Sequence, residues 1–323
     1  MLTNFSPIAE YIISIILGIV QGVTEFLPIS STAHLLIFSK YITAREISLA
    51  ASNVIQFGTF IAILQYFKED ISILFKHLWT KIRSFKEIKL TFTNIKSWIK
   101  DPNQIFDVHA KQDIILSQLI IATVPLIVMA LTLRKFLEGL RSELNYIAIF
   151  LTLGGILIVY SELMHIKKLN IKKSKMMSLK ETIMIGLFQS LAVFPGVSRS
   201  GSALAGGLFL GRNRAESVRF SFLLSIPALG LASIYDLISV SKDFVNKKVT
   251  LLPTLSSWES EKLNLSLLSI FIAFVVSYIV GLLTLKFLLK YLATNDSKVF
   301  ILYRILLVIF ILTTVSVTLK APL

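Results

Sequence analysis

Long apolar runs separated by polar connections dominate the chain. Four windows each hold about 20 residues almost free of charge, which is the length that a helix needs to cross the hydrocarbon core of a bilayer. These windows are residues 113–133, 145–163, 265–285 and 299–319, and the less apolar stretches 50–67 and 215–238 are also long enough to cross. Backbone amides in lipid need partners within their own segment, and barrel-like alternation is absent, so the runs predict helices. We expect an all-α, polytopic integral membrane protein with about six full spans.

Two further apolar stretches are interrupted by proline in similar ways. GIVQ at residues 18–21 leads to FLPISS at 26–31, and GLFQ at 186–189 leads to FPGVS at 194–198. Broken helices at corresponding places in two halves of a membrane protein point to a binding site near mid-membrane depth. The alternative is that two proline breaks resemble each other by chance.

Three predicted spans, an odd number, lie between the two breaks. If each break belongs to a re-entrant hairpin, the first hairpin enters from outside and the second from the cytoplasm, and the two meet inside the bilayer. We therefore expect one membrane domain, 1–323, built as an inverted repeat of the halves 8–163 and 181–319.

Charge orients this arrangement. Of all residues 54% are hydrophobic and only 16% are charged, yet the net charge is +14, with basic residues concentrated in 68–112 and 164–180. Basic loops of membrane proteins are typically cytoplasmic, so the charge does not call for a nucleic-acid partner.

The chain has no cysteine, which excludes disulfides and thiolate metal sites. No Lys or Arg precedes the first apolar run and no small-residue cleavage site follows it, so we expect no removable signal peptide.

The second break, FPGVSRSGSALAGG, holds Arg199 among small and apolar residues. A charge at the bilayer centre costs about 2.5–3.5 kcal/mol on insertion scales, so this arginine needs either a buried acid or an anionic ligand. Pro195 breaks the chain, Ser198 or Ser200 would cap the next segment, and residues 201–210 would form a helix. A helix N-terminus with a guanidinium and hydroxyls nearby is suited to phosphate.

The first break, GIVQGVTEFLPISSTAH, places Gln21 and Glu25 four residues apart, on one face of a helix. An acid inside an apolar segment is a candidate functional residue, and oxygen ligands of this kind suit Mg²⁺ or Ca²⁺.

Hydroxyls follow the proline of the first break. Ser30, Ser31 and Thr32 come directly after it, and His34 lies three residues beyond Ser31. A hydroxyl near an imidazole is the minimum needed for nucleophilic attack with help from a general base. The same residues could instead cap the following helix, and the residues alone do not decide between a serine, the histidine and a water as nucleophile.

Both segments resemble the signature regions of the bacterial undecaprenyl-diphosphatase family, the bacitracin-resistance type of membrane phosphatase. GIVQGVTEFLPISSTAHL is similar to its first motif, and FPGVSRSGSALAGGLFLGRNRAESVRFSFLLSIP to its second, over about a fifth of the chain. The resemblance implies a multi-pass protein of the bacterial plasma membrane, in contact with membrane lipids, that hydrolyses undecaprenyl diphosphate to undecaprenyl phosphate and inorganic phosphate. This reaction recycles the lipid carrier of cell-wall synthesis and confers bacitracin resistance. The resemblance also implies a divalent cation and inverted repeats with re-entrant helices, and it leaves a homodimer open.

Matching the motifs position by position assigns roles. Gln21 and Glu25 take the acidic, metal-linked role, and Arg199 stabilises charge during catalysis. Ser31 becomes the candidate nucleophile, and His34 the base or an alternative nucleophile. The substrate-binding set is Gln21, Ser30, Thr32, Ser198, Arg199 and Ser200.

The chain departs from the family pattern at four places. Gln21 stands where many members have glutamate, which leaves one carboxylate at the expected metal site. Ala33 replaces a common glycine, Ala203 a frequent threonine, and Arg219 a frequent acid.

Two other functions fit parts of this pattern. A transporter or flippase of a polyprenyl phosphate lipid would also use inverted repeats and a diphosphate site. The phosphatidic-acid type of membrane phosphatase is excluded, because it requires a histidine and an aspartate where this chain has Ala205 and Phe209.

Overall fold

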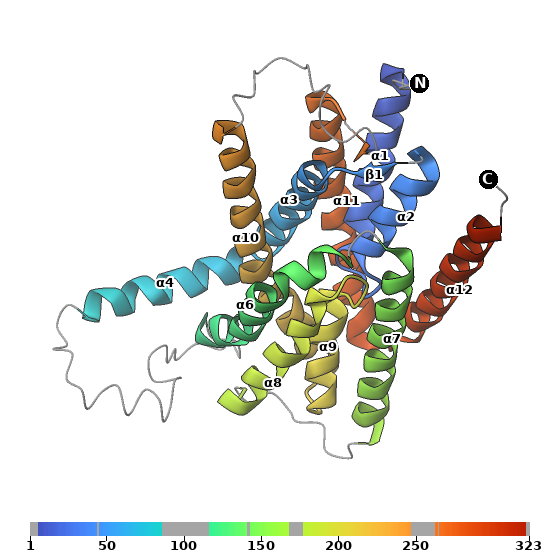
Figure 1. The fold of residues 1–323 in the computed structure, drawn as a ribbon. Helices are drawn as coiled ribbons and strands as arrows, with labels where there is room; N and C mark the ends of the chain where they lie inside the picture. The colour runs from blue at the N-terminus through green and yellow to red at the C-terminus, as the bar shows by residue number, and fades with distance from the viewer. Residues whose placement is uncertain are drawn as a thin grey trace.

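The protein is almost entirely helical, as its apolar runs predict. The computed structural model describes residues 6–43, 45–85, 116–140, 143–167, 177–246, 262–263 and 265–320. Its helices are α1 (Pro7–Thr24), α2 (Ser31–Thr43), α3 (Leu49–Tyr66), α4 (Lys68–Phe85), α6 (Leu116–Glu138), α7 (Leu144–Lys167), α8 (Leu179–Ser190), α9 (Arg199–Phe209), α10 (Arg214–Asn246), α11 (Leu267–Thr294) and α12 (Lys298–Lys320) (Figure 1). A 3₁₀ turn, η2 (Leu191–Val193), links α8 to α9, and the two-residue strands β1 (Glu46–Ile47) and β2 (Lys262–Leu263) pair in parallel.

Six of the described helices are long and apolar enough to cross a membrane: α1, α6, α7, α10, α11 and α12. Five of the six coincide with predicted spans. The sixth is α1, which the broken-hairpin prediction treats as one arm of a hairpin. Helix α3 covers most of the remaining predicted span, 50–67, which stays a prediction.

Small residues bring the helices of the bundle close together. A Cβ atom at Gly18 would lie 2.6 Å from the Ala273 carbonyl oxygen, so α1 packs directly on the backbone of α11. A Cβ atom at Gly186 would lie 2.5 Å from the Ala122 carbonyl oxygen, so α8 packs on α6 in the same manner. Such contacts between small residues are typical of helix association in lipid, where burial of apolar surface contributes little.

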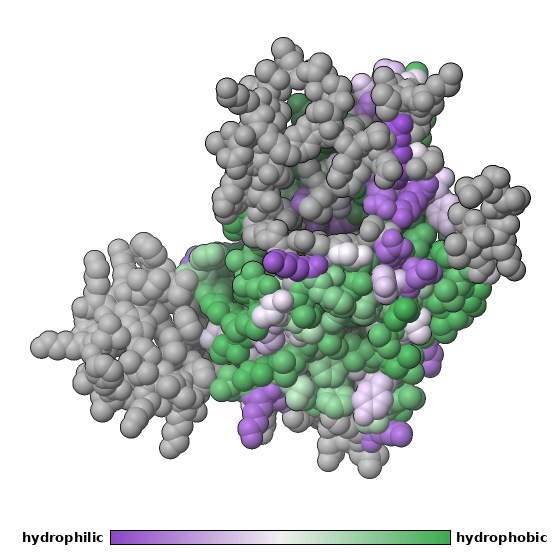
Figure 2. Space-filling model, viewed as in Figure 1, coloured by the Kyte–Doolittle hydropathy of each residue, from purple (hydrophilic) through white to green (hydrophobic). Residues whose placement is uncertain are grey.

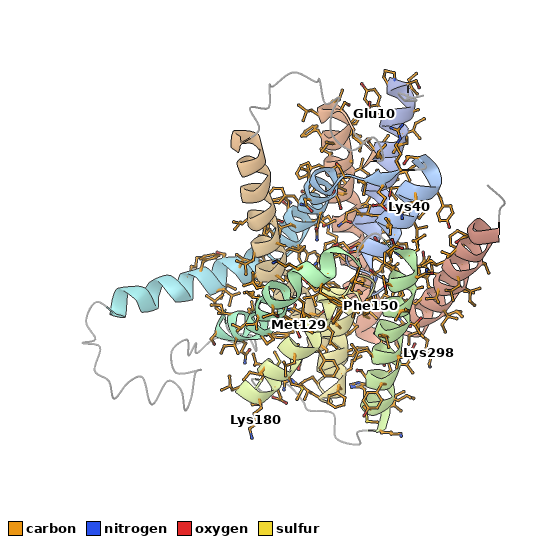
Figure 3. All side chains as sticks on the ribbon, in the orientation of Figure 1. Glu10, Lys40, Met129, Phe150, Lys180 and Lys298 are labelled. Carbon is orange, nitrogen blue, oxygen red and sulfur yellow. The ribbon has the colours of Figure 1, made fainter. Side chains whose placement is uncertain are left out.

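The outer surface of the bundle is suited to lipid. Large apolar side chains are exposed on several helices, among them Leu131 of α6, Leu283 of α11 and Val299 of α12. Figure 2 shows this as a broad apolar area over the body of the molecule. Charged residues such as Glu10 and Lys180 lie at opposite ends of the bundle (Figure 3). The protein is therefore a multi-pass membrane protein.

A buried ion pair joins three helices at the Lys180 end of the bundle. The guanidinium of Arg214 donates from Nη1 to Oε1 of Glu162 at 2.7 Å and from Nη2 to Oε2, which links α10 to α7. The backbone amide of Ser297, directly before α12, donates to the same Glu162 Oε1 at 3.0 Å.

The two basic segments lie partly outside the described residues. Helix α4 occupies the first part of 68–112 and projects sideways from the bundle in Figure 1, while residues 86–112 fall outside. In the segment 164–180, α7 continues to Lys167, residues 168–176 fall outside, and α8 begins at Leu179.

We predict that Gly58→Ala destabilises the bundle. Its new Cβ would lie 2.1 Å from Ser277 Oγ and 2.5 Å from the Phe274 carbonyl oxygen, which forces α3 away from α11. Overpacking of this kind costs about 1–3 kcal/mol, so thermal unfolding in detergent should begin several degrees lower. The control is Gly139→Ala, whose Cβ would meet only the Phe136 carbonyl at 3.9 Å. Equal melting temperatures for the two variants would contradict this account of the packing.

Candidate active site between two broken helices

The first break turns the chain sharply between α1 and α2. The backbone amide of Glu25 closes the last turn of α1 by donating to the Gln21 carbonyl at 3.0 Å. After Pro28 the backbone of Ser30 adopts a φ of 73°, in the left-handed region, and α2 begins at the next residue. Left-handed backbone is uncommon for residues other than glycine, so the surroundings of Ser30 must hold it there.

The second break has the same local form. Gly196 has a φ of 114° and Ser198 a φ of 77°, directly before α9 begins at Arg199. The Ser198 hydroxyl oxygen accepts from the Gly201 amide at 3.3 Å, so Ser198 is the N-cap. The helix thus begins two residues earlier than the predicted range 201–210, and Ser198 rather than Ser200 is its cap. Phe150 of α7, labelled in Figure 3, stacks on Phe194 within this break.

An ion pair joins the two breaks. The Nη2 of Arg199 contacts Oε1 of Glu25, across 174 positions of the sequence. The side chain of Glu25 is 3% exposed and that of Arg199 16%, so the pair is largely screened from the surroundings. The sequence predicts that Arg199 needs either a buried acid or an anionic ligand, and Glu25 is that buried acid. A charged pair of this kind holds the breaks in register, since each charge needs the other once it leaves water.

The second carboxylate oxygen of Glu25 collects the polar residues of the first break. Oε2 accepts a hydrogen bond from Gln21 Nε2 at 2.9 Å and another from the Ser31 hydroxyl at 2.7 Å. The first contact agrees with the predicted common face of Gln21 and Glu25. Gln21 Nε2 also lies 3.5 Å from Thr59 Oγ1 of α3, a neighbour that the spacing of the motif does not reveal.

The hydroxyls of the second break lie beside the first break. Ser198 Oγ and Ser200 Oγ are 3.2 Å apart, and Ser200 Oγ donates to the Leu27 carbonyl at 3.4 Å. The Nε of Arg199 is buried and has no hydrogen-bond partner among the described residues. Buried donors are normally satisfied, so this N–H is available to a ligand oxygen.

His34 and Thr32 stand apart from this cluster. His34 Nδ1 lies 2.7 Å from the Ser30 carbonyl oxygen, and a carbonyl only accepts, so Nδ1 carries the proton. The Nε2 of the neutral ring then accepts from the Tyr303 hydroxyl at 2.7 Å. The hydrogen bond of the Ser31 hydroxyl goes to Glu25, not to His34. Thr32 is exposed.

Two residues of α12 belong to this region although no motif contains them. Tyr303 is the partner of His34, and Arg304 is 1% exposed and binds backbone carbonyls of both breaks. The sequence does contain a signal for Arg304: it is an arginine inside an otherwise apolar span, and such a residue marks a functional or structural site.

Taken together, the fold and the site define a class. The protein is a polytopic helical membrane protein in which a carboxylate, a serine hydroxyl and an arginine meet between two broken helices. The hydroxyl donates to the carboxylate, and the guanidinium and a helix N-terminus face the same cluster. This arrangement suits an anionic group such as a phosphate, with the carboxylate positioned to take the proton of the serine.

Comparison with known proteins identifies the family. Residues 14–310 match the family described as bacitracin resistance protein BacA. An undecaprenyl-diphosphatase of Chloroherpeton thalassium is 37% identical over 314 residues, which is 95% of this chain and 97% of that protein. The undecaprenyl-diphosphatase of Chlorobium phaeobacteroides is 33% identical over 94% of this chain and 96% of its own. That of Trichodesmium erythraeum is 35% identical over 93% and 84%. The chain belongs to the BacA family, as its motifs predict.

We predict that the pair Glu25–Arg199 shows strong energetic coupling. Glu25→Gln leaves the buried guanidinium without a counter-charge, which costs about 3–5 kcal/mol. Arg199→Gln likewise leaves the buried carboxylate without a counter-charge. The double variant should be more stable than either single variant, as measured by thermal unfolding in detergent.

Asp296→Asn is the control for this cycle, because it breaks an exposed pair with Lys298 and should change the melting temperature little. If the destabilisation of the double variant equalled the sum of the two single effects, the two charges would not depend on each other.

Proposed function

We propose that this protein hydrolyses undecaprenyl diphosphate to undecaprenyl phosphate and inorganic phosphate, and so recycles the lipid carrier of cell-wall synthesis and gives resistance to bacitracin. Membership of the BacA family and full-length relatives that are undecaprenyl-diphosphatases support this activity. The observation that carries the chemistry is the hydrogen bond from the Ser31 hydroxyl to Glu25, whose other oxygen contacts Arg199. A nucleophile, its base and a phosphate-binding cation are thereby within contact of one another.

Ser31 is the proposed nucleophile and Glu25 its base. The serine proton passes to Glu25 Oε2 while the serine oxygen bonds to the terminal phosphorus, and the bond from that phosphorus to the bridging oxygen breaks. Glu25 returns the proton to the departing undecaprenyl phosphate. Water then attacks the phosphoserine with Glu25 as base, and the serine oxygen leaves with the returned proton as inorganic phosphate forms.

Arg199 and the start of α9 form the proposed diphosphate cradle. The helix N-terminus carries partial positive charge, the hydroxyls of Ser198 and Ser200 lie beside it, and the buried Nε of Arg199 lacks a partner. Ser30 and Thr32 at the start of α2 would contact the same headgroup from the other break. Stabilising the charge that spreads over the phosphoryl oxygens is the main source of catalysis in such transfers.

His34 is assigned to support rather than to attack. Its Nδ1–H donates to the Ser30 carbonyl and its Nε2 accepts from Tyr303, so both ring nitrogens are engaged away from the Ser31 hydroxyl. Its binding of Ser30 stabilises the left-handed turn that directly precedes the nucleophile.

A divalent cation, Mg²⁺ or Ca²⁺, would bind at Glu25 and Gln21 together with the substrate. No group of three or more His, Cys, Asp or Glu side chains gathers anywhere in the described part of the chain. Mg²⁺ is commonly held by one or two carboxylates and completed by phosphate oxygens and water, so one carboxylate and one amide fit a cation shared with the diphosphate. Bound there, the cation would neutralise negative charge on the phosphate oxygens.

The two halves of the chain are proposed to be an inverted repeat with re-entrant arms at the breaks. Gly18 and Gly186, which correspond in the two motifs, each face an alanine carbonyl on a packed helix.

The turns support the same relation between the halves. Ser30 and Ser198 are the two residues other than glycine with positive φ among those described, and each directly precedes the helix that follows its break. Similar strained turns in the two halves support the proposed repeat, in which Ser31 and Arg199 correspond.

We predict that purified protein in detergent releases phosphate from undecaprenyl diphosphate and that Ser31→Ala lowers the rate by about 10³-fold or more, because the nucleophile is lost. The matched control is Ser39→Ala in the same helix, whose hydroxyl donates only to the Leu36 carbonyl, and it should keep the wild-type rate. Detergent removes the two-sided membrane, so a flippase would release no phosphate. Absence of release by folded wild type would overturn the proposed activity, and full activity of Ser31→Ala would overturn the role of the serine.

A further inference from the structure

Arg304 is a buried cation with an unusual set of partners. It lies in the apolar helix α12 and is 1% exposed. Among the described residues it forms no ion pair, and its guanidinium donates to backbone carbonyl oxygens. A charge held in this way inside a membrane protein is costly, so its position calls for a specific role.

The guanidinium binds three separate segments at once. Nε donates to the Pro28 carbonyl of the first break at 2.6 Å, and Nη2 to the Val197 carbonyl of the second break at 2.8 Å. Nη1 donates to the Leu151 carbonyl of α7 at 3.1 Å and lies 3.4 Å from the Gly196 carbonyl. The donors of arginine form a rigid planar fork, so one side chain sets the spacing between both breaks and α7.

These carbonyls adjoin the two strained serines. The Val197 carbonyl belongs to the peptide bond that enters Ser198, and Pro28 lies two residues before Ser30. A carbonyl that points toward Arg304 fixes the plane of its peptide, and with it the direction of the chain into the left-handed turn. The preceding residue of α12, Tyr303, holds the Ser30 carbonyl indirectly, through His34.

We infer that Arg304 is a positioning residue for catalysis, which acts by holding the first and second breaks in the register that brings Ser31 and Glu25 to Arg199. Arg304 does not touch these three side chains and works through the backbone of the turns beside them. The inference rests on the proposed phosphatase function, because its effect is measured on phosphate release. It adds a contribution from the C-terminal helix to a site whose motifs lie wholly in the earlier parts of the chain.

Neighbouring glycines of α7 provide a test that leaves every charge in place. A Cβ atom at Gly154 would lie 2.6 Å from the Val197 carbonyl oxygen and 2.7 Å from Arg304 Nη1, so Gly154→Ala pushes on this contact directly. At Gly155 the nearest atom would be Arg304 Cδ at 3.8 Å, an ordinary contact. Both substitutions raise helix propensity equally, which makes Gly155→Ala a matched control.

We expect Gly154→Ala to lower kcat about 10- to 100-fold while KM changes less than about threefold, because the reacting groups lose alignment while the headgroup contacts remain. Gly155→Ala should keep both constants within about twofold of wild type. Rates are measured on monodisperse protein, well below its melting temperature, so that loss of folded protein does not count as loss of kcat.

A second pair of variants separates positioning from stability. Arg304→Lys keeps the charge but loses the planar fork of donors, and Arg214→Lys does the same at its pair with Glu162, which is not part of the proposed site. We expect both to lower the melting temperature and only Arg304→Lys to lower kcat. Unchanged kcat in Gly154→Ala and in Arg304→Lys, with active wild type, would overturn the positioning role and leave the phosphatase function standing. Inactive wild type would instead overturn the proposed function.

Discussion

The ion pair between Glu25 and Arg199 is the constraint on which the rest of the site depends. In an apolar bundle neither charge is tolerated alone, and each lies at the end of a helix beside a proline break. Pairing them across 174 positions forces the two breaks to meet. Once they meet, the second oxygen of Glu25 is available to Gln21 and Ser31. The pair thus determines both the fold at the breaks and the chemistry found there.

Meeting breaks expose polar backbone, and the surrounding helices compensate for it. Glycine at positions 18 and 186 lets α1 and α8 pack directly on the backbones of α11 and α6. Arg304 supplies donors for the carbonyls of Pro28 and Val197, which lie outside the helices. His34 adds a side-chain hydrogen bond to the carbonyl of Ser30. Backbone outside helices is therefore tolerated here because side chains from α2 and α12 supply hydrogen bonds to it.

Local chemistry explains what could be predicted from sequence. The breaks are marked by Pro28 and Pro195, and the common face of Gln21 and Glu25 follows from helical spacing, so these features are readable in advance. The partners of Arg199 and Arg304 depend on tertiary packing, and for Arg199 the sequence favours an anionic ligand over the buried acid that the structure places beside it. The proline break also leads α1 to be predicted as one arm of a hairpin, although this helix is long and apolar enough to be a span. The role of each site residue in catalysis needs experiment, because spacing does not distinguish a base from a cap.

The central claim is that a serine held by a carboxylate attacks the phosphorus, and the stereochemical course of the reaction tests it most directly. The substrate is undecaprenyl diphosphate whose terminal phosphorus is made chiral by replacing one oxygen with sulfur and by labelling with oxygen isotopes. The product is the chiral inorganic thiophosphate. Attack by Ser31 followed by attack of water inverts the phosphorus twice, so we predict net retention of configuration. Net inversion would mean a single direct displacement by water and would contradict the account.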